Sequence, residues 1–167
     1  MNDEVVAKIE ASGPRRVMGV GMLASVGVIL IYVAFSTPPS AAWLVFLLVV
    51  GCAALWLSVR MWQATAYRIE LTEEVLRCTD GTEIARVADI ETIDRGFFAF
   101  KPSNGFLMRR KTPGSRAWMP GLWWRMGRRI GVGGVTPGSQ SKAMSEILAA
   151  MIARRDMGAD LEGIRPV

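Results

Sequence analysis

The chain has 167 residues, of which 51% are hydrophobic, and its formal net charge is +5 at pH 7. It contains no histidine, which excludes Ser-His-Asp and Cys-His nucleophiles and histidine-ligated catalytic zinc sites. The basic balance favours anionic partners: phospholipid head groups, nucleic acid or an acidic protein surface.

Two long uncharged segments follow a short N-terminal stretch. Residues 17–35 and 41–59 contain no charged side chain, and each is close to the roughly 20 residues that a bilayer span requires. We therefore predict membrane-spanning helices at about 17–35 and 41–60. A cleaved signal peptide would have a shorter apolar core, and core helices of a soluble protein would show a polar face.

The two predicted helices are joined by a very short linker. Pro38 and Pro39 end the first helix, so the second helix must run back beside it as a hairpin. Small side chains let two membrane helices approach closely. The small residues that we expect to pack the hairpin are Gly19, Gly21, Ser25 and Gly27 on the first helix and Gly51, Ala53 and Ala54 on the second.

Basic residues indicate the orientation of the hairpin. Lys8, Arg15 and Arg16 precede the first helix, Arg60 and Arg68 follow the second, and the connecting loop is uncharged. Because cytoplasmic flanks of membrane helices carry the excess of lysine and arginine, we expect both termini to be cytoplasmic.

The rest of the chain reads as alternating strands and one helix. We predict strands at 67–71, 75–79, 83–86, 90–95 and 105–111, a turn at 112–115, and one or two more strands within 116–132. Apolar residues at helical spacing predict a helix over 141–155, with Ser141 as its N-cap and Gly158 as its stop. The fold class is a membrane α-hairpin plus a mainly antiparallel α+β domain.

These elements divide the chain into four parts. Residues 1–16 form an N-terminal cytoplasmic segment, 17–62 the transmembrane hairpin, 63–157 a cytoplasmic domain and 158–167 a loose tail.

The order of elements resembles the bacterial pleckstrin-homology-like (PH-like) membrane proteins. The resemblance rests on YRIELTEEVLRC (67–78), DIETID (89–94), RRIGVGG (128–134) and the helix SKAMSEILAAMI (141–152), placed directly after a two-helix hairpin. It implies a partly open barrel of two packed sheets with the helix closing one end. It also implies location in the bacterial inner membrane and binding, not catalysis, as the usual role.

Charge is separated along the predicted domain. Residues 68–100 carry eight acids and four bases, whereas residues 101–143 carry nine bases and no acid. The basic strands could face an anionic leaflet, where each lysine or arginine contributes about 1 kcal/mol, or an acidic membrane-protein partner. Opposite charges could also simply pair across the sheet. Single-strand nucleic-acid binders also interleave arginine with aromatics, but a membrane tether and the lack of a recognition motif make us expect no nucleic-acid partner.

The segment GLWWRMGRRIGVGG (121–134) indicates which side chains of the basic strands face outward. Strict alternation directs Leu122, Trp124, Met126 and Ile130 toward the core and leaves Trp123, Arg125 and Arg129 facing outward. The candidate contacts for lipid or partner are Lys101, Arg109, Arg110, Lys111, Arg116, Trp123, Arg125, Arg128 and Arg129.

No residue pattern predicts catalysis, a cofactor or a metal. The glycine-rich run before Lys142 departs from the phosphate-loop spacing, and Cys52 and Cys78 are two isolated thiols. We therefore expect a non-enzymatic integral inner-membrane protein whose domain is an interaction or assembly module. The alternative is a structural accessory subunit of a larger membrane complex. The expected partners are membrane lipids and another membrane protein or complex.

Overall fold

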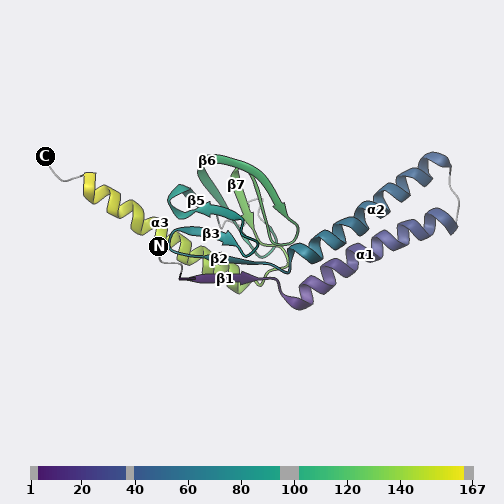
Figure 1. The fold of residues 1–167 in the computed structure, drawn as a ribbon, viewed down its shortest axis with the longest axis horizontal. Helices are drawn as coiled ribbons and strands as arrows, with labels where there is room; N and C mark the ends of the chain where they lie inside the picture. The colour runs from purple at the N-terminus through teal and green to yellow at the C-terminus, as the bar shows by residue number, and fades with distance from the viewer. Residues whose placement is uncertain (1–3, 37–39, 95–101, 164–167) are drawn as a thin grey trace.

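The computed structural model describes residues 4–36, 40–94 and 102–163, with side chains described as far as residue 158. A helical hairpin projects from one end of a β-rich body, and a long C-terminal helix extends toward the opposite end (Figure 1). Pro38, Pro39, Lys101 and the end of the strand expected at 90–95 lie outside the described residues.

The hairpin consists of α1 (Gly13–Ser36) and α2 (Ala41–Ala64). In the described part of the chain these are the two helices that are long and apolar enough to cross a membrane. Only 11% and 17% of their most apolar windows are buried, whereas a core helix of a soluble protein would be mostly buried. Their remaining surface is apolar and exposed, which suits contact with lipid.

Two of the predicted small residues make the closest approach between the helices. A Cβ atom added to Gly27 would lie 2.8 Å from Leu55 Cγ and 2.9 Å from the Gly51 carbonyl oxygen, and one added to Gly51 would lie 2.8 Å from Ile31 Cγ1. Both glycines are buried. The backbones therefore meet at this pair, as small residues allow.

The other small residues predicted to pack the hairpin lie only in part at the contact between the helices. Gly21 has nothing within 4 Å of its added Cβ, and Ser25 and Ala53 are exposed, so the expectation that they pack the hairpin is wrong. Ala54 is half-buried. Gly19 packs against Met61 near the base of the hairpin. One helical face makes the contact, so small residues a half-turn away from Gly27 point outward.

Gly27→Ala is expected to destabilise the hairpin by about 1–3 kcal/mol through overpacking. Gly21→Ala is the matched control, since it gains the same helix propensity but meets open space. Thermal unfolding of the full chain in detergent, followed by circular dichroism, measures the difference. Equal midpoints for the two variants would contradict the packing seen here.

The body contains two antiparallel sheets in the described part of the chain. The first has the order β1-β2-β3-β4, formed by Ala7–Glu10, Arg68–Leu71, Val75–Cys78 and Glu83–Arg86. The second has the order β5-β6-β7, formed by Ile90–Asp94, Phe106–Met119 and Trp123–Val132. A short 3-10 helix, η1 (Val87–Asp89), links the sheets, and α3 (Gly138–Gly163) follows them.

Strand β1 is the largest departure from the sequence analysis, which treated residues 1–16 as a separate segment. It pairs with β2 in the register Ala7↔Leu71 and Ile9↔Ile69, and Ile9 is fully buried. The helical hairpin is therefore inserted between two neighbouring strands of one sheet. The β-rich unit includes β1 as well as residues after 63.

Two further expectations on boundaries are wrong. The turn predicted at 112–115 lies inside β6, where the register with β7 shifts instead of reversing. Helix α3 begins at Gly138, so Ser141 is not its N-cap: it is buried in the first turn, with its Oγ 3.3 Å from Thr136 Oγ. Gly158 does not stop the helix, because an interior glycine costs only about 1 kcal/mol.

The core lies between the two sheets and α3. Its largest buried side chains include Ile69 and Leu76 from the first sheet, Phe106 and Trp123 from the second, and Met144 from α3. All belong to one continuous cluster, so the sheets and the helix form a single folded body.

Candidate functional site

The base of the hairpin is held by a contact between its two helices and is attached to the body by hydrogen bonds. Between the helices, the Arg16 guanidinium of α1 lies 3.9 Å from the ring centroid of Trp62 of α2 and donates to the Trp62 carbonyl oxygen at 2.7 Å. Arg15 donates to the Thr136 carbonyl oxygen at 2.8 Å, and the Ser12 N–H donates to Val135 at 2.9 Å. These contacts fix which face of the body stands next to the hairpin.

That face includes the turn between β6 and β7. An added Cβ at Gly121 in this turn would lie 3.0 Å from Met61 Cε and 3.2 Å from Thr65 Cγ2, at the end of α2. Trp118, near the end of β6, shares a shallow hollow with Arg60 and Gln63. Figure 1 shows α3 running away toward the other end of the molecule. The β6–β7 turn is thus the part of the second sheet that adjoins α2.

An exposed apolar group occupies the outer face of β6 and β7. The side chains of Trp118 and Met126 are 56% and 59% exposed, and Trp124 between them is half-buried. With Arg116 and Arg129 they line an open, mainly apolar hollow of about 690 Å³. We call Trp118, Trp124 and Met126 the aromatic patch. Sequence reasoning missed Trp118 and assigned the other two to the core.

The inward and outward residues of β7 are reversed at its start. Trp123 is 1% exposed and Arg125 is 9% exposed, whereas Met126 faces outward. Gly127 then adopts a φ of 60°, near a shift in register between β6 and β7. The phase of alternation along β7 changes where the register with β6 shifts, so Ile130 is buried as expected. The prediction that Trp123 and Arg125 face outward is wrong.

Arg125 instead joins the two sheets from inside. Its Nη1 donates to the carbonyl oxygens of Glu83 and Ile84 at 2.9 and 3.0 Å, and its Nε donates to the Ser115 carbonyl oxygen at 2.8 Å. Burial, and then the neighbouring Arg110, lower the pKa of Arg125, but arginine starts so high that it stays charged at neutral pH. Arg125 lines the same hollow as Arg116 and Arg129, but its donors are engaged by oxygens of β4 and β6, so its role is structural.

The remaining predicted bases divide into paired and unpaired groups. Arg109 forms an ion pair with Glu91 at 3.5 Å, and Arg110 forms one with Asp89 at 2.6 Å. Among the described residues, no carboxylate pairs with Lys111, Arg116, Arg128 or Arg129, all of which are exposed. Arg128 donates to the Lys111 carbonyl oxygen. The uncompensated charge of the basic half is therefore concentrated on β6 and β7.

Part of the acidic half is neutralised within its own sheet, and two more of its acids, Asp89 and Glu91, pair with arginines of β6. Arg77 pairs with Glu70 at 3.2 Å, Arg86 pairs with Glu83 at 3.2 Å, and Glu10 from β1 lies 3.4 Å from Arg68. Pairing of opposite charges across strands thus accounts for part of the charge separation. It leaves the unpaired arginines of the second sheet unexplained.

Asp89 in η1 holds the middle of β6 through a partly exposed network. Its carboxylate accepts from Arg110 Nε at 2.6 Å, from the Thr112 N–H at 3.2 Å and from Thr112 Oγ1 at 2.9 Å. Desolvation by itself raises the pKa of Asp89, but the hydrogen bonds from Arg110 and Thr112 outweigh it and the pKa is lowered. The network favours the charged carboxylate.

Asp89→Asn is expected to lower the free energy of unfolding by about 2 kcal/mol at pH 7, since it removes charge-assisted hydrogen bonds. Because the folded-state pKa lies below the unfolded value of about 3.9, this stabilisation is present above pH 4 and is lost as the pH falls through the folded pKa. Urea unfolding at pH 7 and near pH 3 measures it. A difference between wild type and variant that does not shrink at the lower pH would contradict this assignment.

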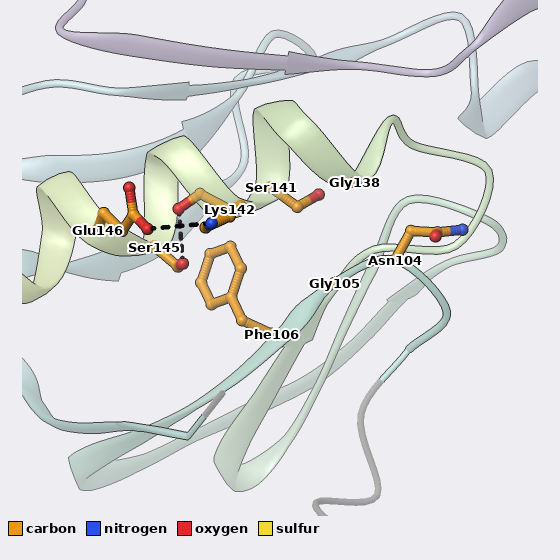
Figure 2. A pocket seen from close by; sticks show the side chains of 8 residues that line it. All are labelled: Asn104, Gly105, Phe106, Gly138, Ser141, Lys142, Ser145 and Glu146. Carbon is orange, nitrogen blue, oxygen red and sulfur yellow. Dashed lines mark hydrogen bonds and ion pairs between the residues drawn. The ribbon is translucent and has the colours of Figure 1, made fainter. Parts of the chain in front are cut away.

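A second hollow, of about 380 Å³, lies where the start of α3 meets the beginning of β6 (Figure 2). Lys142 in this hollow lies 4.0 Å from Glu146, and Ser145 donates to the Lys142 carbonyl oxygen at 2.8 Å. Its cation is therefore compensated by a neighbour on the same helix. The aromatic patch, with unpaired arginines at its rim, is the stronger candidate for a contact surface.

Within the described ranges, no three histidine, cysteine, aspartate or glutamate residues cluster closely enough to hold a metal ion. Burial raises the pKa of the Cys78 thiol, which makes it a poor nucleophile. Comparison with protein-family models, with curated proteins and with solved structures gives no match.

Proposed function

We propose that this chain is a non-enzymatic integral protein of the bacterial cytoplasmic membrane, with both termini cytoplasmic and a PH-like domain that serves as an interaction or assembly module. The antiparallel four- and three-stranded sheets followed by a helix support the PH-like assignment. The two apolar helices support the membrane location.

The pairing of β1 with β2 supports the proposed topology. These strands flank the hairpin on either side and share one ladder, so both ends of the hairpin must emerge on the side of the β-rich body. The basic residues Arg15, Arg16 and Arg60 stand at those same ends, which is the cytoplasmic side by the distribution of positive charge.

One observation carries the proposed role: exposed apolar side chains and unpaired arginines lie together on the outer face of β6 and β7, and Trp118 at the end of this group adjoins the base of the hairpin. Trp118 and Met126 are more than half exposed, Arg116 and Arg129 share their hollow, and Arg60 of α2 lies beside Trp118. A free surface seldom keeps large apolar side chains grouped in this way unless something covers them.

Site-specific photo-crosslinking in native membranes tests the role. With a photoreactive amino acid at Trp118 of the full chain, we expect adducts with lipid or protein that are much weaker when the same group replaces Ala150, an exposed residue of α3. Equal, low labelling at the two positions would contradict an interaction module. Protein adducts together with a stable large assembly in mild detergent would favour the accessory-subunit alternative.

A further inference from the structure

We infer that the outer face of β6 and β7 holds an anionic phospholipid of the adjoining leaflet, with its phosphate at Arg116 and Arg129 and its apolar part on the aromatic patch. This inference rests on the proposed function and names the partner of the same surface. The two arginines and the three patch residues line a single hollow.

The unpaired positive charges of the hollow favour binding of an anion. Neither Arg116 nor Arg129 has a carboxylate partner in the described part of the chain, and a third arginine, Arg109, faces Arg129 across the β6–β7 ladder. Arg109 is compensated by Glu91, whereas the other two guanidinium groups are not. A guanidinium binds phosphate oxygens in a bidentate manner, so a phosphodiester suits this pair.

The apolar side chains that line the hollow favour an apolar group next to that anion. Trp118 and Met126 supply exposed apolar surface, and the Trp124 ring packs close to Gly131, where an added Cβ would lie 2.5 Å from its Cε2. An inorganic anion or a soluble sugar phosphate would leave this surface in water. A lipid covers both parts, since its phosphate is joined to glycerol and acyl chains.

The position of the hollow selects the lipid over an acidic protein. Trp118 lies beside Arg60, whose guanidinium is 5.8 Å from the ring of Trp56 on the exposed face of α2. Tryptophan and arginine at the end of a membrane helix mark the head-group level. The apolar surface of α2 therefore continues into the aromatic patch, and lipids that surround α2 already stand at the hollow.

Fluorescence quenching in lipid nanodiscs tests the inference on the full chain. Cys52 on the exposed face of α2 is replaced by alanine, buried Cys78 is kept, and a bimane fluorophore is attached at Met126→Cys. Discs contain phosphatidylcholine, alone or mixed with phosphatidylglycerol, and a lipid with a nitroxide near its head group. We expect strong quenching of the bimane fluorescence in the mixed discs. In the double variant Arg116→Gln/Arg129→Gln we expect this quenching to fall on the order of tenfold.

Two controls separate the possible sources of the signal. Bimane at Ala150→Cys should stay unquenched, and Arg86→Gln/Arg154→Gln, which removes two exposed arginines elsewhere, should quench like the parent. Inorganic phosphate should not compete with the lipid. Because Arg116 and Arg129 are exposed and make no ion pair among the described residues, their loss should leave the melting temperature unchanged.

Weak quenching at position 126 in the mixed discs, or equal quenching after loss of the two arginines, would overturn the lipid assignment. If the photoreactive amino acid at position 118 then crosslinks to protein in native membranes, the proposed interaction module is retained and only the identity of its partner was wrong. If the photoreactive amino acid at position 118 gives no adduct, both the interaction module and the phospholipid site are wrong.

Discussion

Replacing Arg125 with leucine is expected to lower the free energy of unfolding by about 3–5 kcal/mol, because several backbone carbonyl oxygens would lose their donor at a cost of about 1–3 kcal/mol each. Leucine would leave the carbonyl oxygens of Glu83, Ile84 and Ser115 without the donors that they now share. A buried acceptor that loses its partner bears the full cost of desolvation. The two sheets would also lose a direct tie between β4 and β7.

Chemical denaturation of the full chain in detergent, followed by near-ultraviolet circular dichroism, measures this loss. Arg116→Leu is the control, because Arg116 lies on the neighbouring strand but is exposed. Arg125→Lys keeps the charge but cannot reach both sheets with one nitrogen, so an intermediate loss is expected. If Arg125→Leu and Arg116→Leu unfold at the same denaturant concentration, the buried contacts of Arg125 contribute no stability.

The same residue shows where sequence reasoning stops. Alternation predicts inward and outward faces only while a strand is regular, and the preference of arginine for water placed Arg125 outside. Gly127 breaks that regularity with its positive φ. Ile130, after this glycine, follows the predicted phase, whereas Trp123, Arg125 and Met126 before it are reversed. A glycine within an otherwise alternating segment was the available signal.

Elements specified by local patterns were predicted well. Strands β2 and β3, the two apolar helices and most of α3 follow from alternation and helical spacing. The charge separation also identified β6 and β7 as the basic strands. It could not indicate which arginines are neutralised, since Asp89 reaches Arg110 only through the fold.

Strand β1 was missed for a different reason. Its four residues, AKIE, are too few for a periodic pattern, and its partner β2 lies beyond both helices of the hairpin. Long-range pairing of this kind is decided by the tertiary structure and not by local propensity. The missed strand changes how the domain can be studied, because residues 63–157 contain the second sheet but lack one strand of the first.

A fragment that starts at residue 63 is accordingly expected to remain unfolded or to aggregate. Without β1 it exposes Ile69 and Leu71, which are fully buried, and leaves β2 as an open edge. It also loses the hydrogen bond from the Glu10 N–H to Gln140 on α3, at 3.0 Å. A fragment in which residues 4–12 are joined to residue 66 by a short Gly/Ser linker, in place of the hairpin, should fold as a soluble domain.

The point variant Ile9→Ala should cost the full chain about 2–4 kcal/mol, as expected for a truncated core isoleucine, whereas exposed Val5→Ala should change little. Heteronuclear NMR spectra of the two fragments test the same requirement. We expect dispersed amide signals only from the fragment that contains β1. A dispersed spectrum from the fragment that starts at residue 63 would show that β1 is dispensable. If β1 is required, the first sheet cannot close until both ends of the hairpin lie on the same side, so in the proposed membrane topology folding of the domain would report correct insertion of the hairpin.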